Sequence, residues 1–313
     1  QSEIAKSHVD VNKPGIITEI ATQYSLESNR LLGFLLKLDY CEMHIATCDP
    51  WKRKCGGVPR NSFVIVKVSP AHVNAGDKHF CDRIILARVT DSVPTPVAGD
   101  ALNTLFAVHK AQAVMDPYTT KELQWSAMRA SIVGTFYDLG SKISFGNDVD
   151  TFFGAHAYEV YSPSQPHLEV LINSFIETSA PLEIGRLRYT ETPSVAGEMT
   201  VPVKVDPRDF AGHAHGQRTA LFGKTRFGKS NTIKVIADTI LRGSNPPGQI
   251  IFDPSGEYTY WNEQDGGSLF MQHADRSVRY SLNPKVVAQE GGHEAPRLLK
   301  INFYEAVSVG HQL

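Results

Sequence analysis

The chain has 313 residues, a net charge of −2 and 20% charged residues. This length can hold two domains with a substantial core, and the charge balance excludes a broadly basic coat for nucleic acid but not a local basic channel. No apolar run approaches the roughly 18 residues of a membrane-spanning helix and no charged-then-apolar leader is present, so we expect a cytoplasmic protein with no membrane partner.

The first half of the chain contains short apolar runs separated by turn-rich pieces such as Gly56-Gly57-Val58-Pro59 and Pro94-Thr95-Pro96. Runs of this length and composition are typical of β-strands. Many short strands joined by polar turns indicate a small barrel or a sandwich. The expected strands span residues 31–38, 42–47, 62–69, 83–91, 128–137 and 156–161.

Two residue clusters in this half have the composition of a zinc site and of a DNA contact, but neither is assigned as one. Cys41, Cys48 and Cys55 lie near His44, but their spacing fits no common zinc pattern, so we expect reduced thiols. The basic cluster Lys52-Arg53-Lys54 falls between strands and is interpreted as a solvated loop rather than a DNA contact.

A helix is expected where the first half ends. Leu168, Leu171, Ile172, Phe175 and Ile176 recur at helical spacing after a proline-rich turn. We therefore place the end of the N-terminal domain near residue 165 and assign residues 166–313 to a second domain. A weaker helical pattern covers residues 101–115.

Residues 223–230 read Gly-Lys-Thr-Arg-Phe-Gly-Lys-Ser, which matches the phosphate-binding pattern G-x-x-x-x-G-K-[ST]. The glycines let backbone amides point at phosphate oxygens, Lys229 supplies a positive charge for the β- and γ-phosphates, and the Ser230 hydroxyl can ligate Mg²⁺. The pattern therefore predicts ATP and Mg²⁺ as cofactors. The candidate nucleotide contacts are Gly223, Lys224, Thr225, Arg226, Phe227, Gly228, Lys229, Ser230 and Asn231.

The pattern requires a strand before the loop and a helix after it. Residues 219–222 are a short apolar run typical of a buried strand, and residues 229–241 place apolar side chains on one helical face. Residues 249–253 form a second apolar run. Together they predict a β-α-β unit with a parallel sheet and the ligand at the carboxyl ends of the strands.

The second of these runs ends in a carboxylate, Asp253, and Glu257 follows four residues later. Beside a triphosphate, one carboxylate can hold Mg²⁺ through water, and the other can orient or deprotonate the attacking water. We assign Asp253 to the metal, and Glu257 together with Lys229 to catalysis. The alternative is that Asp253 only caps the strand and Glu257 is a solvated loop residue.

The two segments together resemble the HerA group of hexameric DNA translocases, which belong with the FtsK-like motor ATPases. In that family a phosphate loop ending in Gly-Lys-Ser-Asn-Thr is followed by a strand reading Phe-Asp-Pro-x-Gly-Glu-Tyr, and residues 228–232 and 252–258 fit both patterns. Residues 182–187 and 201–205 also resemble the lead-in to the family's ATPase core. Lys224, Arg226 and Phe227 depart from the Gly, Ser and Thr that are usual in the family's loop.

The resemblance implies an N-terminal β-barrel over residues 1–165, followed by a RecA-like α/β ATPase with a parallel sheet. It also implies a homo-hexamer that moves double-stranded DNA through its central channel and carries a nuclease or defence effector on the barrel. A later acidic strand, a sensor residue and an arginine finger are not visible in the sequence. We therefore expect the ATPase core over residues 166–313 to be incomplete at its C-terminus.

Two other functions stay open. The assembly could pump protein, as secretion ATPases with related cores do, and stimulation of hydrolysis by duplex DNA would separate these two motors. Alternatively, it serves mainly as a scaffold that assembles and activates an effector enzyme, with slow or regulatory hydrolysis.

Overall fold

The chain forms two compact units. The first comprises Gln1–Ile176 with Gly185–Lys204, and the second comprises Glu177–Ile184 with Val205–Leu313. The domain division expected at residue 165 stays a prediction. The computed structural model describes residues 15–96, 98–149, 152–176, 181–187, 189, 200–206, 220–224, 228–243, 246–263, 265–283 and 295–299.

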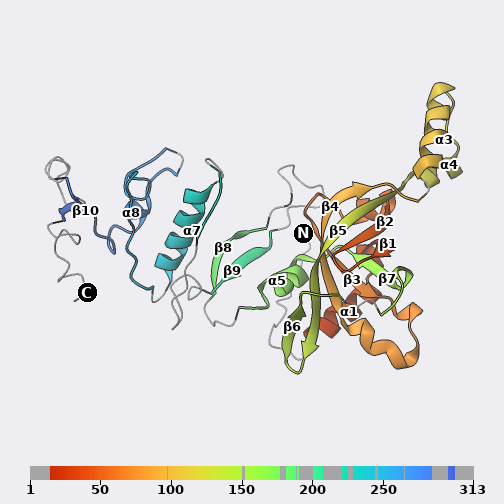
Figure 1. Cartoon of the computed structure of the whole chain (residues 1–313), viewed down its shortest axis with the longest axis horizontal. Coiled ribbons are helices and arrows are strands. Elements are labelled where there is room, and N and C mark those ends of the chain that lie inside the picture. The colour runs from red at the N-terminus through yellow and green to blue at the C-terminus, as the bar shows by residue number, and fades with distance from the viewer. Residues whose placement is uncertain are drawn as a thin grey trace, which may run out of the picture. The chain divides into compact units, whose positions relative to one another are not determined.

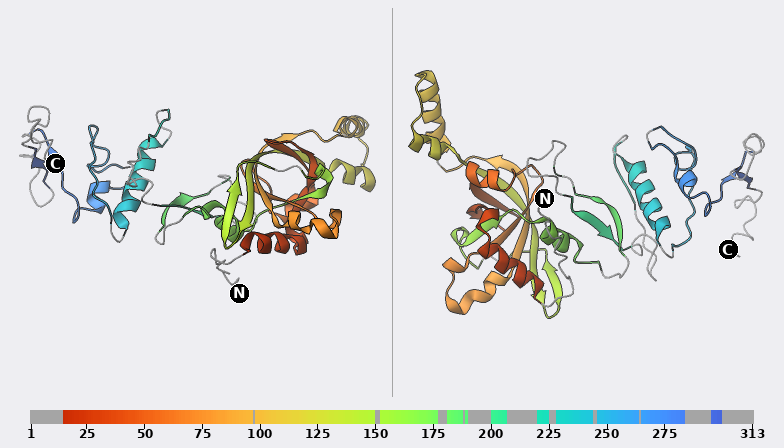
Figure 2. Two further views of the ribbon diagram at one scale, coloured as in Figure 1. Left: turned by 60° about the horizontal axis from the view of Figure 1, so that its bottom comes forward. Right: turned by 180° about the vertical axis from the view of Figure 1, so that it is seen from behind.

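Six strands of the first unit close into an antiparallel barrel (Figures 1 and 2). Around the barrel the order is β2-β1-β7-β3-β4-β5, and β5 pairs with β2 to complete it. A seventh strand, β6 (Lys142–Gly146), pairs with β5 outside the closed barrel. The predicted N-terminal β-barrel is therefore confirmed, with every expected strand present. The barrel strands are β1 (Leu31–Leu38), β2 (Glu42–Cys48), β3 (Phe63–Val68), β4 (Ile84–Val93), β5 (Trp125–Leu139) and β7 (Tyr158–Tyr161).

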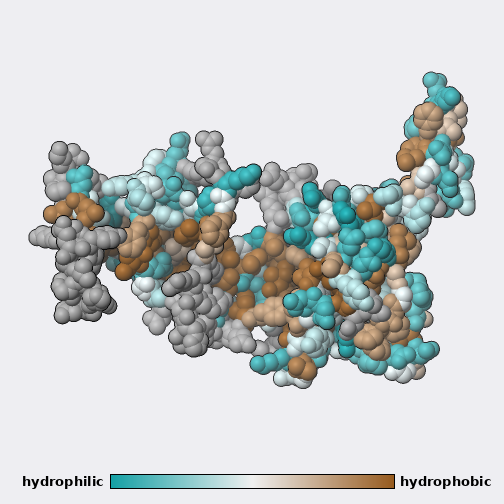
Figure 3. All heavy atoms as spheres, viewed as in Figure 1, coloured by the Kyte–Doolittle hydropathy of each residue, from teal (hydrophilic) through white to brown (hydrophobic). Residues whose placement is uncertain are grey.

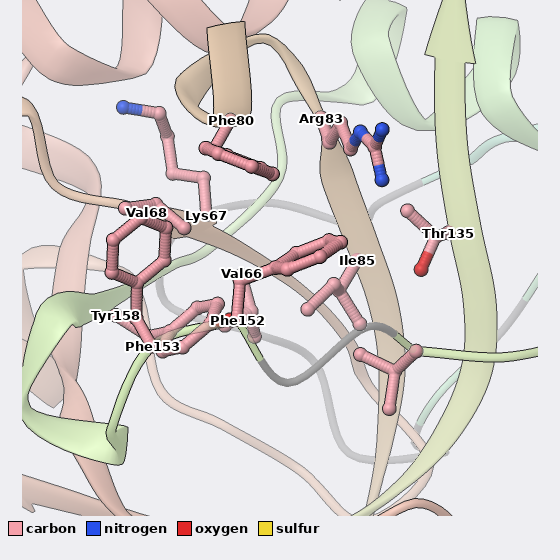
Figure 4. Close-up of a pocket in the computed structure, with 11 residues that line it drawn as sticks. Val66, Lys67, Val68, Phe80, Arg83, Ile85, Thr135, Phe152, Phe153 and Tyr158 are labelled. Carbon is pink, nitrogen blue, oxygen red and sulfur yellow. The ribbon is translucent and has the colours of Figure 1, made fainter. Parts of the chain in front are cut away.

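Inward-facing apolar side chains from all six barrel strands fill the centre. One region keeps a cavity of about 30 Å³, whose lining includes Val66, Phe80, Phe152, Phe153 and Tyr158 (Figure 4). Such a volume has room for about one or two water molecules. The barrel interior is therefore a packed core, too small for a nucleotide. The buried strand residues are Leu32, Leu35, Met43, Ile45, Val64, Val66, Val68, Ile85, Ala87, Val89, Met128, Ala130, Tyr158 and Val160.

Two helices, α1 (Ile16–Leu26) and α5 (Gln165–Asn173), pack against a second apolar cluster on the outside of the barrel. The buried Tyr24 hydroxyl of α1 accepts a hydrogen bond from the Ser164 amide at 2.8 Å and lies 3.0 Å from His167 Nδ1. At the start of α1, the Asp138 carboxylate of β5 accepts bonds from the amides of Ile17 and Thr18, at 3.1 and 2.8 Å. The helix expected near residues 168–176 is confirmed by α5.

An arm made of α3 (Ala98–Lys110) and α4 (Pro117–Leu123) projects from the barrel between β4 and β5 (Figure 1). Neither helix buries a residue, and Phe106 is 70% exposed. Figure 3 shows apolar side chains on the surface of the arm. The weaker helical prediction over residues 101–115 is confirmed by α3. Short helical turns lie at α2 (Asp49–Lys54), Ser28–Arg30, Pro70–His72, Ala75–Asp82 and Ala155–Ala157.

A two-stranded sheet, β8 (Leu182–Arg186) with β9 (Pro202–Val205), follows α5. The Asn173 side chain donates to the Pro202 carbonyl and accepts from the Lys204 amide, both at 2.9 Å. Lys204 also pairs with Glu169 of α5 at 2.7 Å. These contacts fix β9 against the end of α5.

The second unit contains α7 (Lys229–Arg242), α8 (Leu269–Gln272) and a short parallel pair, β10 (Tyr280–Ser281) with β11 (Arg297–Leu298). The helix expected at residues 229–241 is confirmed by α7. The prediction of strands at 219–222 and 249–253 was wrong, because the described residues 220–224 and 249–253 form no strand. A strand needs a hydrogen-bonded neighbour, and neither segment has one among the described residues. Among the described residues, the predicted RecA-like parallel sheet is therefore not shown, and β10 with β11 is a parallel pair of two residues each.

Candidate functional site

The phosphate-binding pattern ends at the start of α7. Gly228 precedes this helix with φ 80° and ψ 12°, the left-handed conformation that glycine adopts at low cost. A Cβ placed on Gly228 would meet nothing within 4 Å, so the backbone conformation, not space, favours glycine here. The Gly228 carbonyl accepts bonds from the Thr232 amide at 2.9 Å and the Thr232 hydroxyl at 3.0 Å, which closes the first turn. The α7 helix therefore starts sharply at the loop.

The Lys229 side chain folds back over the loop. Its Nζ donates to the Lys224 carbonyl at 2.8 Å. Its Cγ and Cδ lie 3.4 Å from the position that a Cβ on Gly223 would take. The ammonium group thus lies over the loop at the positive end of α7, where a phosphate would also be attracted. A bulkier residue at 223 would displace this lysine.

The other predicted loop residues are placed only in part. Ser230 is half-buried and Asn231 exposed in the first turn of α7. The Ser230 hydroxyl has no hydrogen-bond partner among the described residues, so it is free to bind a cation. Thr225, Arg226 and Phe227 lie outside the described residues.

Asp253 holds a tight turn together. Its Oδ2 accepts bonds from the Tyr258 amide (2.9 Å), the Thr259 amide (3.0 Å) and the Thr259 hydroxyl (2.7 Å). Its Oδ1 accepts only one, from the Glu257 amide at 3.0 Å. A carboxylate oxygen has two lone pairs, so Oδ1 retains capacity for a further ligand while Oδ2 is saturated.

The Glu257 carboxylate is exposed and has no hydrogen-bond partner in the described parts of the chain. Neither Asp253 nor Glu257 contacts Lys229 or Ser230 there. The Asp253 carboxylate thus caps the turn that follows it, whereas the alternative considered from the sequence was a cap on a strand ending at Asp253. The neighbouring Tyr258 has its pKa raised by burial first, and then by the Glu257 and Asp253 charges.

The segment that follows the Asp253 turn lies beside α7 through contacts along the helix. Lys234 pairs with Asp265 at 2.5 Å, and this bond holds the pKa of Asp265 below its usual range. Further along, Asp238 pairs with His273 at 2.8 Å and with Arg242 at 2.9 Å. Sequence reasoning missed these pairs. Of these pairs, only Asp238 and Arg242 could have been predicted from the sequence, because their i,i+4 spacing favours an ion pair on a helix.

Apolar side chains flank the loop on the segments where strands were expected. Phe222 and Phe252 are each 89% exposed, and Ile250 is 86% exposed. Buried strands would cover such residues, so their exposure follows from the unpaired state of the two segments. Among the described residues, the two ends of the loop and the helix are placed, and neither flanking segment is a strand.

Other site types find no support among the described residues. No group of three or more His, Cys, Asp or Glu side chains there is arranged to hold a metal ion. The described helices also lack the length and apolarity needed to cross a bilayer. The four cysteines are free thiols.

Residues 182–305 match the family model of the central domain of helicase HerA. A comparison with curated proteins found no match. The matched range contains the phosphate loop, α7 and the acidic turn. This part of the chain is therefore similar to the central domain of helicase HerA.

Proposed function

We propose that the chain binds and hydrolyses ATP with Mg²⁺ as part of a hexameric double-stranded DNA translocase. The observation that carries the proposal is the geometry of Gly228 and Lys229, which puts an ammonium group over a loop at the start of a 14-residue helix, inside a HerA-type domain. This arrangement suits an anion with several phosphate oxygens.

Each residue has a proposed task. When ATP binds, the Lys229 ammonium group donates to phosphate oxygens in place of the Lys224 carbonyl. The free backbone amides at the start of α7 donate further hydrogen bonds to the phosphates. Ser230 and the open side of Asp253 Oδ1 hold the cation, Asp253 through water. Glu257 orients the attacking water. Bound Mg²⁺ would neutralise charge that develops on the phosphates.

An ATPase assay on the full-length protein, with and without duplex DNA, tests this proposal. We expect duplex DNA to stimulate turnover, and Lys229→Ala to lower it by about 100-fold or more, as loss of a charge-stabilising group does. Lys234→Ala is the matched control, because it removes a lysine from the same helix but away from the loop. Equal turnover in wild type and Lys229→Ala would refute the phosphate-loop assignment.

Native mass spectrometry tests the oligomer. We expect a mass of about six protomers, since a motor that encircles DNA completes its nucleotide sites between neighbouring subunits. We also propose that the barrel docks an effector such as a nuclease. A strict monomer at working concentration would contradict the translocase.

A scaffold function is the second candidate. It is favoured by the Asp253 geometry, because three of the four bonds to this carboxylate saturate one oxygen and serve the turn. In that case ATP binding would drive assembly, and hydrolysis would be slow. A Glu257→Gln variant that assembles and activates its effector without hydrolysing ATP would support the scaffold over the motor.

A further inference from the structure

Three aromatic rings meet on the outer surface of the barrel near the arm. Phe34 of β1, Trp51 of α2 and Trp125 of β5 have ring centroids 5.5 to 6.5 Å apart. Leu36 lies two residues from Phe34 on the same strand. We call Phe34, Leu36, Trp51 and Trp125 the aromatic patch.

Strand register explains why the rings lie there. Phe34 is paired with Ala46, and Ala46 is paired with Ala127, so the three side chains share one face of the sheet. Both alanines are buried although they face outward. Trp125 lies two residues before Ala127 and therefore on the same face. The rings cover the small side chains, which gives the aromatic patch a fixed platform.

The platform is only partly covered. Phe34 is 37% exposed, Leu36 38% and Trp125 41%. Since a large aromatic residue has roughly 150–250 Å² to bury, these side chains leave on the order of 200 Å² of apolar surface in water. Gln124, at the end of α4, accepts a bond from the Asp49 amide of α2 at 3.2 Å, so the arm begins beside the patch. Because the rings pack on the buried alanines, their exposed parts form a fixed apolar surface.

The helix that carries Trp51, α2, has more positive than negative side chains. Lys52 is neutralised by Asp49 at 3.0 Å and donates to the Ser126 hydroxyl at 3.0 Å. Arg53 and Lys54, in the last turn of α2, are exposed and have no ion-pair partner among the described residues. Two positive charges thus follow Trp51 by two and three residues in α2.

The closed barrel limits how a partner can bind. β1, β2 and β5 are each paired on both sides. A partner strand therefore cannot add to the sheet here, and recognition must use side chains.

We propose that the aromatic patch docks an acidic segment of a partner protein that packs an apolar side chain against the rings. The carboxylates of this segment pair with Arg53 and Lys54. The inference makes specific the docking task proposed for the barrel, but it needs no nucleotide.

The ring geometry favours protein over nucleic acid. The three interplanar angles are 85°, 62° and 86°, so the rings meet edge to face. A stacked base needs a free ring face along a basic groove, whereas these rings are tilted against one another and only two cations in α2 have no ion-pair partner among the described residues. An aliphatic or aromatic side chain of a partner can instead pack against the exposed ring edges.

A random copolymer of glutamate and tyrosine is a suitable probe, because it carries both acids and anchors. We would use Trp261→Phe protein without nucleotide, so that fluorescence reports on Trp51 and Trp125 alone. We expect saturable binding, and about tenfold weaker binding for Arg53→Glu/Lys54→Glu. The charge-matched control Lys78→Glu/Lys142→Glu, at exposed positions on other elements, should stay within about twofold.

The apolar anchor has its own test. Trp125→Ala should weaken binding of fluorescein-labelled copolymer, and polyglutamate should bind less than the copolymer. Equal binding by the patch variant and its control, or no binding to wild type, would overturn the proposal. Stronger binding of oligothymidylate, lost in the same patch variant, would also overturn it and identify a nucleic-acid surface. Copolymer binding is measured without nucleotide, so it does not depend on ATPase activity. Failure of the docking proposal can therefore be distinguished from failure of the proposed ATPase function.

Discussion

Replacing Asp253 separates its bonds within the turn from any bond to a metal. The carboxylate accepts four bonds, three of them at Oδ2. In Asp253→Ala all four are lost, and loss of a capping side chain costs about 2 kcal/mol. In Asp253→Asn the amide oxygen can take the Oδ2 position and keep three bonds, so the cost should be about 1 kcal/mol.

Hydrogen exchange measures the turn directly. Because 1.4 kcal/mol is a factor of ten, the Tyr258 and Thr259 amides should exchange about 30-fold faster in Asp253→Ala and about fivefold faster in Asp253→Asn. Asp275→Ala is the control, since Asp275 is exposed and has no bond within the described chain. Unchanged protection in Asp253→Ala would refute the capping geometry.

The same two variants test whether Asp253 takes part in Mg²⁺ binding. If Asp253 also holds Mg²⁺, Asp253→Asn should require much more Mg²⁺ for hydrolysis although its turn is nearly intact. An Mg²⁺ titration of ATPase activity that overlays the wild type would remove Asp253 from the metal site and leave only the turn.

The remaining predictions concern three other positions. Glu257→Gln should bind ATP as wild type does but hydrolyse it about 100-fold more slowly, and a normal rate by single-turnover assay would exclude Glu257 as the base. Gly228→Ala should cost about 1 kcal/mol from its φ of 80° and weaken binding of a fluorescent ATP analogue; the same change at exposed Gly140, also at positive φ, should leave binding intact. Burial lowers the pKa of His167 below its ordinary 6.5, so the unfolded state binds more protons at acid pH. The stability from the Tyr24–His167 contact is then fully present above pH 6.5 and lost as pH falls through the folded pKa. The pH slope of thermal unfolding should flatten in His167→Gln and not in the exposed control His109→Gln.

Much of the first unit could be predicted from the sequence because its signals are local. Strands such as Leu31–Leu38 combine apolar runs with flanking turns, and these fix both ends. The α1 helix was missed because Ile16, Ile17 and Ile20 were not read as one helical face, although all are buried. β6 was missed because its five residues depend on the β5 hairpin for their pairing.

In the second unit, the sequence-based prediction was correct only for the element whose hydrogen bonds are all local. α7 forms because its hydrogen bonds lie within the helix, and Gly228 starts it. Phe222 and Phe252 have the composition of buried strands, but a parallel strand depends on distant segments that the described residues do not bring alongside. The function of Asp253 as a cap could not be resolved from spacing, because the same carboxylate suits a turn or a metal.

The order of strands in the barrel has a consequence for synthesis on the ribosome. β7, a strand of four residues, is the last barrel strand in the sequence, yet it lies between β1 and β3, the first and third. Its pairs Leu31↔Tyr161 and Val68↔Tyr158 join residues far apart in the chain. The hairpins β1–β2 and β3–β4 can form as soon as they are made, whereas the barrel cannot close until residue 161 has left the exit tunnel. Until then β1 and β3 each have one unpaired edge. Pairing of β7 with both strands closes the barrel.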